Sequence, residues 1–200
     1  MKRTTRWNIK WIDSVDSTNN EAKRRIESLS GLSVIAAYNQ TAGRGQRGNT
    51  WLSAPGKNLT FSVVFKYGDD QLRNLNAADQ HVINDIISSS IVELLSKYGI
   101  DSRIKLPNDI YVGNRKICGI LIEHCVCGAD LLYSVIGVGL NVNQTEFDTS
   151  LPNPTSMKLE IDLEEINLQS LLDELLAILS QHIQMKLVNC LINRESCNLA

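Results

Sequence analysis

The 200-residue sequence predicts an α+β fold, with helices packed on a mixed, mostly antiparallel sheet. Four strand-like segments between residues 103 and 142 are separated only by short turn-forming clusters, which indicates consecutive hairpins. Apolar residues recur at helical spacing over residues 82–95 and 166–183, so two helices are available to cover the sheet. The content of 43% hydrophobic and 21% charged residues is ordinary for one globular domain, residues 1–200.

The first part of the chain alternates strand and helix patterns. Residues 7–11 alternate apolar and polar side chains and predict an opening strand. Thr18 and Glu21 have the spacing of a capping box, which predicts a helix that begins there and ends before Gly31. A continuous apolar run at residues 34–38 predicts a buried strand, and the alternation over residues 59–65 predicts a half-buried one.

The second part begins with the helix over residues 82–95, which Gly99 ends. Pro152 and Pro154 then precede the long final helix, whose apolar pattern fades after about residue 187, where we expect fraying. The four strands between these helices are predicted at residues 103–106, 110–112, 116–123 and 131–142.

Residues 41–51, TAGRGQRGNTW, are the most informative stretch of the chain. Glycines let backbone N–H groups approach an anion closely, and the guanidinium groups of Arg44 and Arg47 add permanent positive charge. The stretch therefore predicts an anion-binding loop. The same composition also occurs in solvated turns, and the loop lacks the GK[ST] ending of a P-loop.

Three other segments are candidates for the same site. Residues 16–19, DSTN, place hydroxyl and amide groups before a helix, where they either cap it or bind a polar ligand. Lys105 stands at a strand end before a turn, either as a functional cation or as a surface lysine. Alternating glycines in residues 137–143, GVGLNVN, mark either a close approach of the backbone to a ligand or ordinary packing.

The net charge of −2 and the pI of about 5.9 do not fit a general nucleic-acid binder. The sequence has no run of ~18 apolar residues and no apolar signal core, so we expect no membrane partner and a cytoplasmic location. The odd number of five cysteines fits a reducing compartment. Cys125 and Cys127 make at most half a zinc site, so no metal site is predicted. The histidines at 81, 124 and 182 are scattered and predict surface or packing roles.

Taken in order, the segments DSTN, GRGQRGNTW, KLPND and GVGLNVN resemble the catalytic domain of biotin protein ligases, the biotin–[acetyl-CoA-carboxylase] ligase family. The resemblance covers residues 16–143 and extends more loosely to residues 154–157. It implies a fold related to class II aminoacyl-tRNA synthetases. It also implies that biotin and ATP form biotinyl-5′-AMP and that a lysine of a biotin carboxyl carrier protein, as in acetyl-CoA carboxylase, then takes the biotin. ATP implies Mg²⁺, for which the sequence identifies no ligand.

The resemblance also assigns roles to residues. Two anions, the biotin carboxylate and the α-phosphate, must meet during adenylation, so the protein must supply positive charge and positioning. The catalytic residues implied are Lys105, Arg44 and Arg47. The biotin-binding residues implied are Ser17, Thr18, Asn19, Gln40, Gly43, Arg44, Gly45, Gln46, Lys105 and Gly119. The nucleotide-binding residues implied are Arg47, Trp51, Asn108 and Asn141, although Trp51 equally suits a packing anchor for the loop.

The sequence departs from the family pattern in several places. Gln46 and Asn49 stand where the family commonly has arginine, and Leu106 replaces a common tryptophan. We expect no helix-turn-helix domain before Trp7, hence no DNA partner, and no small SH3-like domain after residue 200.

The alternatives are a lipoate protein ligase and a non-catalytic biotin-binding or carrier-binding module. The loop and KLPND favour biotin, and the three cations favour an enzyme. Dimerisation through a sheet edge stays open.

Overall fold

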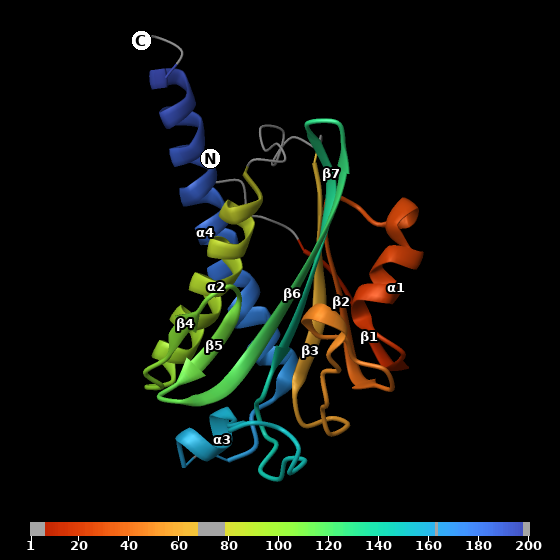
Figure 1. The fold of residues 1–200 in the computed structure, drawn as a ribbon, viewed down its shortest axis with the longest axis vertical. Coiled ribbons are helices and arrows are strands. Elements are labelled where there is room, and N and C mark those ends of the chain that lie inside the picture. Colours follow the sequence, from red (N-terminus) through yellow and green to blue (C-terminus); the bar gives the residue numbers. More distant parts are fainter. Residues whose placement is uncertain (1–6, 68–78, 163, 198–200) are drawn as a thin grey trace.

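The computed structural model describes residues 7–67, 79–162 and 164–197 (Figure 1). These residues form a seven-stranded sheet of order β1-β2-β3-β7-β6-β5-β4. Strands β1 and β2 are parallel and the other neighbouring pairs are antiparallel, which confirms the predicted mixed, mostly antiparallel sheet. The strands are β1 (Asn8–Val15), β2 (Leu32–Gln40), β3 (Leu59–Lys66), β4 (Arg103–Lys105), β5 (Asp109–Val112), β6 (Arg115–Cys127) and β7 (Asp130–Leu140).

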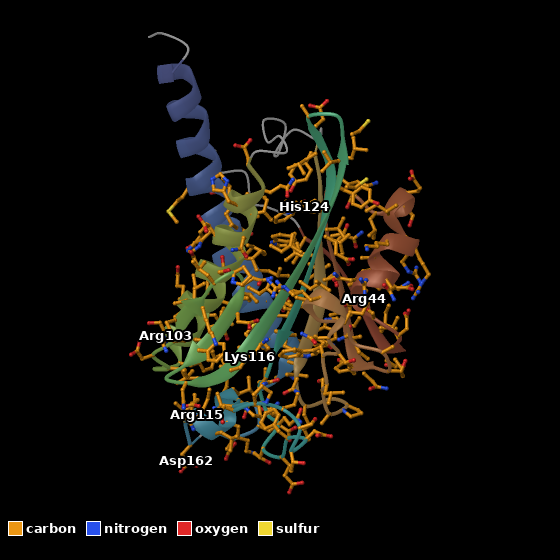
Figure 2. All side chains as sticks on the ribbon, in the orientation of Figure 1. Arg44, Arg103, Arg115, Lys116, His124 and Asp162 are labelled. Carbon is orange, nitrogen blue, oxygen red and sulfur yellow. The ribbon has the colours of Figure 1, made fainter. Side chains whose placement is uncertain are left out.

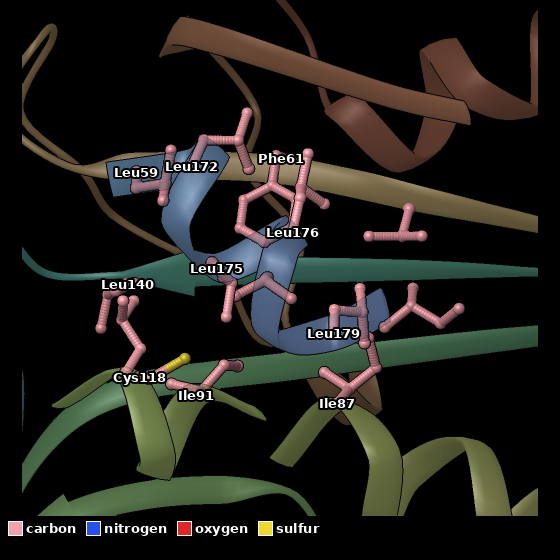
Figure 3. Close-up of a cluster of buried hydrophobic side chains, with 14 of the residues drawn as sticks. Leu59, Phe61, Ile87, Ile91, Cys118, Leu140, Leu172, Leu175, Leu176 and Leu179 are labelled. Carbon is pink, nitrogen blue, oxygen red and sulfur yellow. The ribbon is translucent and has the colours of Figure 1, made fainter. Parts of the chain in front are cut away.

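Helices cover both faces of the sheet. The helices are α1 (Thr18–Arg24), α2 (Gln80–Lys97), α3 (Met157–Glu160) and α4 (Leu168–Cys197). Helices α2 and α4 pack together on one face, and α1 lies on the other (Figure 1). Figure 3 shows leucines of α4 packed between Phe61 of β3 and Ile87 and Ile91 of α2. None of the helices in the described ranges is long and apolar enough to cross a membrane.

Strand β3 is buried on both faces, so the prediction of a half-buried strand is wrong. Its neighbours on either side are β2 and β7, which place it in the interior of the sheet. Phe61 faces the large cluster of α2 and α4, whereas Val64 joins a smaller cluster with Ala22 of α1. The second cluster explains the burial, because α1 covers a face that sequence alternation assigns to solvent.

The start of α1 also differs from the prediction. Ser17 occupies the N-cap position with extended backbone, φ −155° and ψ 135°, and Thr18 is already the first helical residue. Glu21 does not close a capping box but pairs with Arg24, at 2.8 Å, and with Arg25. The helix ends at Arg24 and one short 3₁₀ turn follows. At the other end of the chain, α4 continues to Cys197, beyond the residues where the sequence pattern fades.

Candidate functional site

A cavity of about 260 Å³ opens where the start of α1, the loop after β2 and the middle of β6 and β7 meet. It gathers all the predicted biotin-binding residues except Gly43 and Lys105. The side chains and backbone that line it belong to Ser17, Thr18, Asn19, Gln40, Arg44, Gly45, Gln46, Arg47, Asn49, Thr50, Trp51, Pro107, Asp109, Lys116, Gly119, Ile120, Leu121, Gly137, Val138 and Gly139.

A second cavity of about 510 Å³ adjoins the first. Of the predicted nucleotide-binding residues, Trp51 and Asn141 line it, whereas Arg47 lines the first cavity and Asn108 lines neither. The two cavities therefore meet at a shared wall rather than lying apart. That wall consists of Asn49, Thr50, Trp51, Asp109 and Lys116, which line both.

Buried hydroxyl and amide groups form the floor of the first cavity. Gln40 Oε1 accepts hydrogen bonds from Thr18 N at 2.8 Å and from Thr18 Oγ1 at 3.2 Å. Ser62 Oγ lies 2.7 Å from Thr18 Oγ1 and 2.6 Å from Asn19 Oδ1. Because the Gln40 oxygen is held by Thr18, its amide Nε2 is left as the donor for a ligand.

Ser17 is buried and lines the cavity, but its side chain makes no capping hydrogen bond to α1. Ser17 thus occupies the N-cap position, but the alternative that its side chain caps the helix is wrong. The Ser17 hydroxyl can donate or accept a hydrogen bond, and the Gln40 amide nitrogen can donate one. A buried polar ligand needs such partners, since each unpaired polar group costs about 1–3 kcal/mol.

Residues 41–51, called here the glycine-rich loop, fold back on themselves as a short antiparallel ladder. Trp51 N donates to Gly43 O at 2.9 Å, and Gly45 N donates to Asn49 O at 2.7 Å. A Cβ on Gly43 would collide with the Trp51 carbonyl, so Gly43 shapes the loop rather than the cavity. Arg47 adopts φ 53°, a left-handed conformation that is uncommon for residues other than glycine, while it lines the cavity.

The Trp51 indole rests on two facing glycines. The register of β6 and β7 places Gly119 opposite Gly139. A Cβ on Gly119 would lie 2.8 Å from Trp51 Cζ3, and one on Gly139 would overlap the indole. Gly119 lines the first cavity as predicted, but its missing side chain makes room for Trp51.

Two buried polar atoms near the second cavity have no hydrogen-bond partner within the described ranges. They are the Nε1 donor of Trp51 and the Oδ1 acceptor of Asn141. Both residues line that cavity. Buried polar atoms are normally paired, so this donor and this acceptor are exceptions among the residues that line the cavity.

The predicted cations have different surroundings. Arg44 is already paired, with Nη2 3.0 Å from Glu123 Oε1 and Nη1 2.9 Å from Asn20 Oδ1. Figure 2 shows Arg44 beside α1. Lys105 is exposed and lines neither cavity; its Nζ lies 4.5 Å from the ring centroid of Tyr111, which lines the second.

The sequence analysis missed Lys116, which lines both cavities. Its Nζ lies 2.7 Å from Asp109 Oδ1 and 5.7 Å from the Trp51 ring centroid. The register of β5 and β6 pairs Tyr111 with Lys116 and Asp109 with Gly119, which brings the lysine to the turn of the KLPND segment. The sequence predicted the hairpin of β5 and β6 but not its register, and only the register shows that Lys116 lies beside Asp109.

Asn108 braces the same turn from within the protein. It is buried, and its Nδ2 donates to Ile120 O at 2.5 Å, while Ile120 N donates to Asn108 O at 3.1 Å. These bonds hold the turn against β6. The observed role of Asn108 is thus to fix the position of its neighbours Pro107 and Asp109, which line the first cavity.

No group of three or more His, Cys, Asp or Glu side chains in the described part of the chain is arranged to hold a metal ion. Cys125 and Cys127 are free thiols, and burial raises the pKa of the Cys118 thiol. His124 and His182 line neither cavity: Nδ1 of the first lies 2.6 Å from Ser134 Oγ, and Nε2 of the second lies 2.8 Å from a glutamate of α2.

Comparisons with known proteins identify the family of the chain. Residues 11–141 match the Biotin/lipoate A/B protein ligase family. The bifunctional ligase/repressor BirA of Escherichia coli is 34% identical over 163 residues, which are 79% of this chain and 49% of that protein. The biotin–[acetyl-CoA-carboxylase] ligase of Paracoccus denitrificans is 32% identical over 64% of this chain and 51% of its own length. The chain thus spans about half the length of these relatives.

The structural comparison gives the same family. The biotin protein ligase of Aquifex aeolicus in complex with biotin and ATP matches with a TM-score of 0.72 and 27% identity, covering 88% of this chain and 70% of that chain. The Leishmania major enzyme with biotin matches with a TM-score of 0.70 and 25% identity, covering 86% of this chain and 73% of that one. The α+β fold is therefore the biotin protein ligase fold, and the chain belongs to the biotin/lipoate A/B protein ligase family.

Proposed function

We propose that this chain activates biotin with ATP to biotinyl-5′-AMP and transfers the biotin to a lysine of a biotin carboxyl carrier protein. The observation that carries the proposal is the shared wall of the two cavities. Adenylation requires a carboxylic acid and a nucleotide to meet with their reacting groups in contact. One cavity offers Ser17 and Gln40 to a polar ring, the second cavity adjoins it, and Lys116 lies in the wall between them.

The ureido ring of biotin suits the inner end of the first cavity. Its carbonyl oxygen needs donors and its N–H groups need acceptors. The Gln40 amide supplies N–H donors, and the Ser17 hydroxyl serves in either direction. The carboxylate tail then extends toward the glycine-rich loop and the wall, where Arg47 and Lys116 line the cavity.

The chemistry needs charge compensation more than a protein nucleophile. A biotin carboxylate oxygen forms a bond to the α-phosphorus of ATP, and the bond to the bridging oxygen of pyrophosphate breaks. Arg47, Lys116 and, by resemblance, Lys105 counter the charge that builds on these oxygens. In the second step the amine of the carrier lysine attacks the acyl carbon and AMP leaves, which yields the amide after loss of one proton.

Mg²⁺ belongs to the proposal as a companion of ATP. In sites that bind ATP, Mg²⁺ is usually held by the phosphates and one or two protein carboxylates, so the phosphates would bring the metal with them. The free thiols Cys125 and Cys127 fit the proposed cytoplasmic location. We further propose that residues 1–200 act as one catalytic domain.

The direct test is incubation of the chain with ATP, radiolabelled biotin and a biotin carrier domain. We expect label on the acceptor lysine of the carrier and none on a carrier in which that lysine is arginine. A parallel incubation with labelled lipoate separates the related ligase. Neither adenylate nor labelled carrier would identify a non-catalytic binding module, and preferential transfer of lipoate would identify a lipoate ligase.

Gln46 leads to a prediction about release of the adenylate. It stands where the family commonly has arginine, and its Nε2 is 3.5 Å from Ile120 O, too far for a strong hydrogen bond. We expect the adenylate to escape and to biotinylate lysines of the chain itself. Gln46→Arg should lower self-biotinylation several-fold, because a guanidinium adds an attraction for the phosphate. Mass spectrometry after incubation with biotin and ATP measures this, and equal labelling of both proteins would contradict it.

A further inference from the structure

Glu123 of β6 connects its own strand with α1 and with the glycine-rich loop, and it lines neither cavity. Lys23 of α1 lies 2.6 Å from its Oε1, and Arg44 of the glycine-rich loop lies 3.0 Å from the same oxygen. Its Oε2 accepts from Asn19 Nδ2 at 2.8 Å. One carboxylate thus holds a loop cation, a helix cation and a residue of the cavity floor.

The bond to Asn19 fixes the direction of an amide in the floor. Because Nδ2 is held by Glu123, Oδ1 points toward Ser62, which lies 2.6 Å away. The amide lies so close to Gly137 that a Cβ there would overlap it. Glu123 and Ser62 together therefore fix the orientation of the Asn19 amide.

The bond to Arg44 attaches the loop to the body of the protein. The backbone ladder of the loop is internal, from Gly43 to Trp51 and from Gly45 to Asn49, and only its first residues, 41 and 42, donate to the backbone of residues 15 and 16. Arg44 is the loop side chain that reaches both Glu123 and α1, through Asn20. Three hydrogen bonds, two to Glu123 and one to Asn20, engage the Arg44 guanidinium in the ligand-free structure.

The negative charge of the Glu123 carboxylate separates two cations. Lys23 and Arg44 both approach Oε1, so without a negative charge between them two cations would face each other. Burial raises the pKa of Glu123, but the hydrogen bonds from Lys23, Asn19 and Arg44 outweigh this effect and leave the pKa below its ordinary value. The group is ionised at neutral pH.

We propose that Glu123 is a positioning residue of the proposed ligase reaction, which clips the glycine-rich loop over the cavity through Arg44 and sets the orientation of Asn19. This rests on the proposed function. In this assignment the Arg44 side chain closes the loop, whereas the resemblance assigns it to the biotin carboxylate. The charge that faces the carboxylate then comes from Arg47 and the lysines.

Hydrogen exchange of the ligand-free protein tests the clip without any assay of activity. We expect Glu123→Gln to raise exchange of residues 43–51 about tenfold, because a charge-assisted hydrogen bond is lost. Arg44→Gln should have the same effect, and the double variant should exceed the larger single effect by less than about twofold. Glu165→Gln, which breaks an exposed pair with Lys57 at 2.9 Å, is the matched control. The proposal would be overturned if exchange were unchanged in either single variant, or if the increase in the double variant equalled the product of the two single increases.

Biotin kinetics provide the second measurement. Glu123→Gln should raise KM for biotin about tenfold and change kcat less than threefold, and Glu123→Asp should restore part of the affinity. Loss of kcat alone would refute the positioning role. Should the wild-type chain fail to use biotin, the proposed function fails, and the exchange experiment still decides whether Glu123 holds the loop. Should Glu123→Gln not fold, Arg44→Gln carries the exchange test, since Arg44 is at the surface.

Discussion

Replacement of Lys105 by alanine is expected to lower the rate of biotinyl-adenylate formation on the order of 100-fold, with a much smaller change in biotin affinity. The family resemblance places this lysine where carboxylate and α-phosphate meet, and an interaction formed in the transition state affects rate more than binding. In the ligand-free structure its Nζ lies against Tyr111, one side chain from the second cavity. A flexible lysine at an exposed strand can turn from that ring toward a phosphate.

A comparison with Lys116→Ala tests which of the two lysines is the essential cation. Lys116 lines both cavities without any movement, so the structure alone would favour it as the essential cation. Pre-steady-state adenylate formation should be measured for both variants, with Lys10→Ala on β1 as an exposed control. A large loss of rate with Lys116→Ala and a normal rate with Lys105→Ala would reassign the role to Lys116.

Substitution of Gly139 by valine should be about as damaging, although no chemical group is removed. The added Cβ would overlap the Trp51 indole, so the indole must leave the wall that the two cavities share. Displacement of reacting groups by ~1 Å can lower a rate on the order of 100-fold, and we expect that loss in adenylate formation. The measurement is the single-turnover rate, alongside thermal unfolding to verify folding.

The cause can be checked in a Trp51→Ala background. If the clash with the indole explains the loss, adding Gly139→Val to Trp51→Ala should lower the rate less than threefold further. A native rate in Gly139→Val alone would show that the indole has another place to go. If the fold loss of rate in the double variant equalled the product of the losses in the two single variants, Gly139 would have a role independent of Trp51.

The strands and main helices of the described chain were largely predictable, because each depends on local periodicity and on turn residues. The hairpins around residues 113–114 and 128–130 are examples, since glycines mark both turns. The burial of β3 was not predictable in the same way, because it depends on α1 packing on the second face of the sheet. A short helix gives little indication of which face it will cover.

The site was predicted in its residue types and less well in their roles. Ser17, Thr18 and Gln40 do share one cavity, but the capping box wrongly assigned the helix start, because spacing cannot tell an N-cap from a first helical residue. The contacts of Lys116 and Glu123 depend on strand register and on long-range ion pairs, with partners 79 and 100 residues away for Glu123. No local pattern contains such distances.

The distribution of the lining residues along the chain has a consequence for folding. The first cavity draws on positions from Ser17 to Gly139, so it exists only after β2, β6 and β7 have assembled. A molecule that fills it binds the native chain and not the unfolded one, and at one hundred times its Kd it stabilises the native state by about 2.7 kcal/mol. The supply of ligand would then help to set how much of the protein survives proteolysis, independently of any turnover.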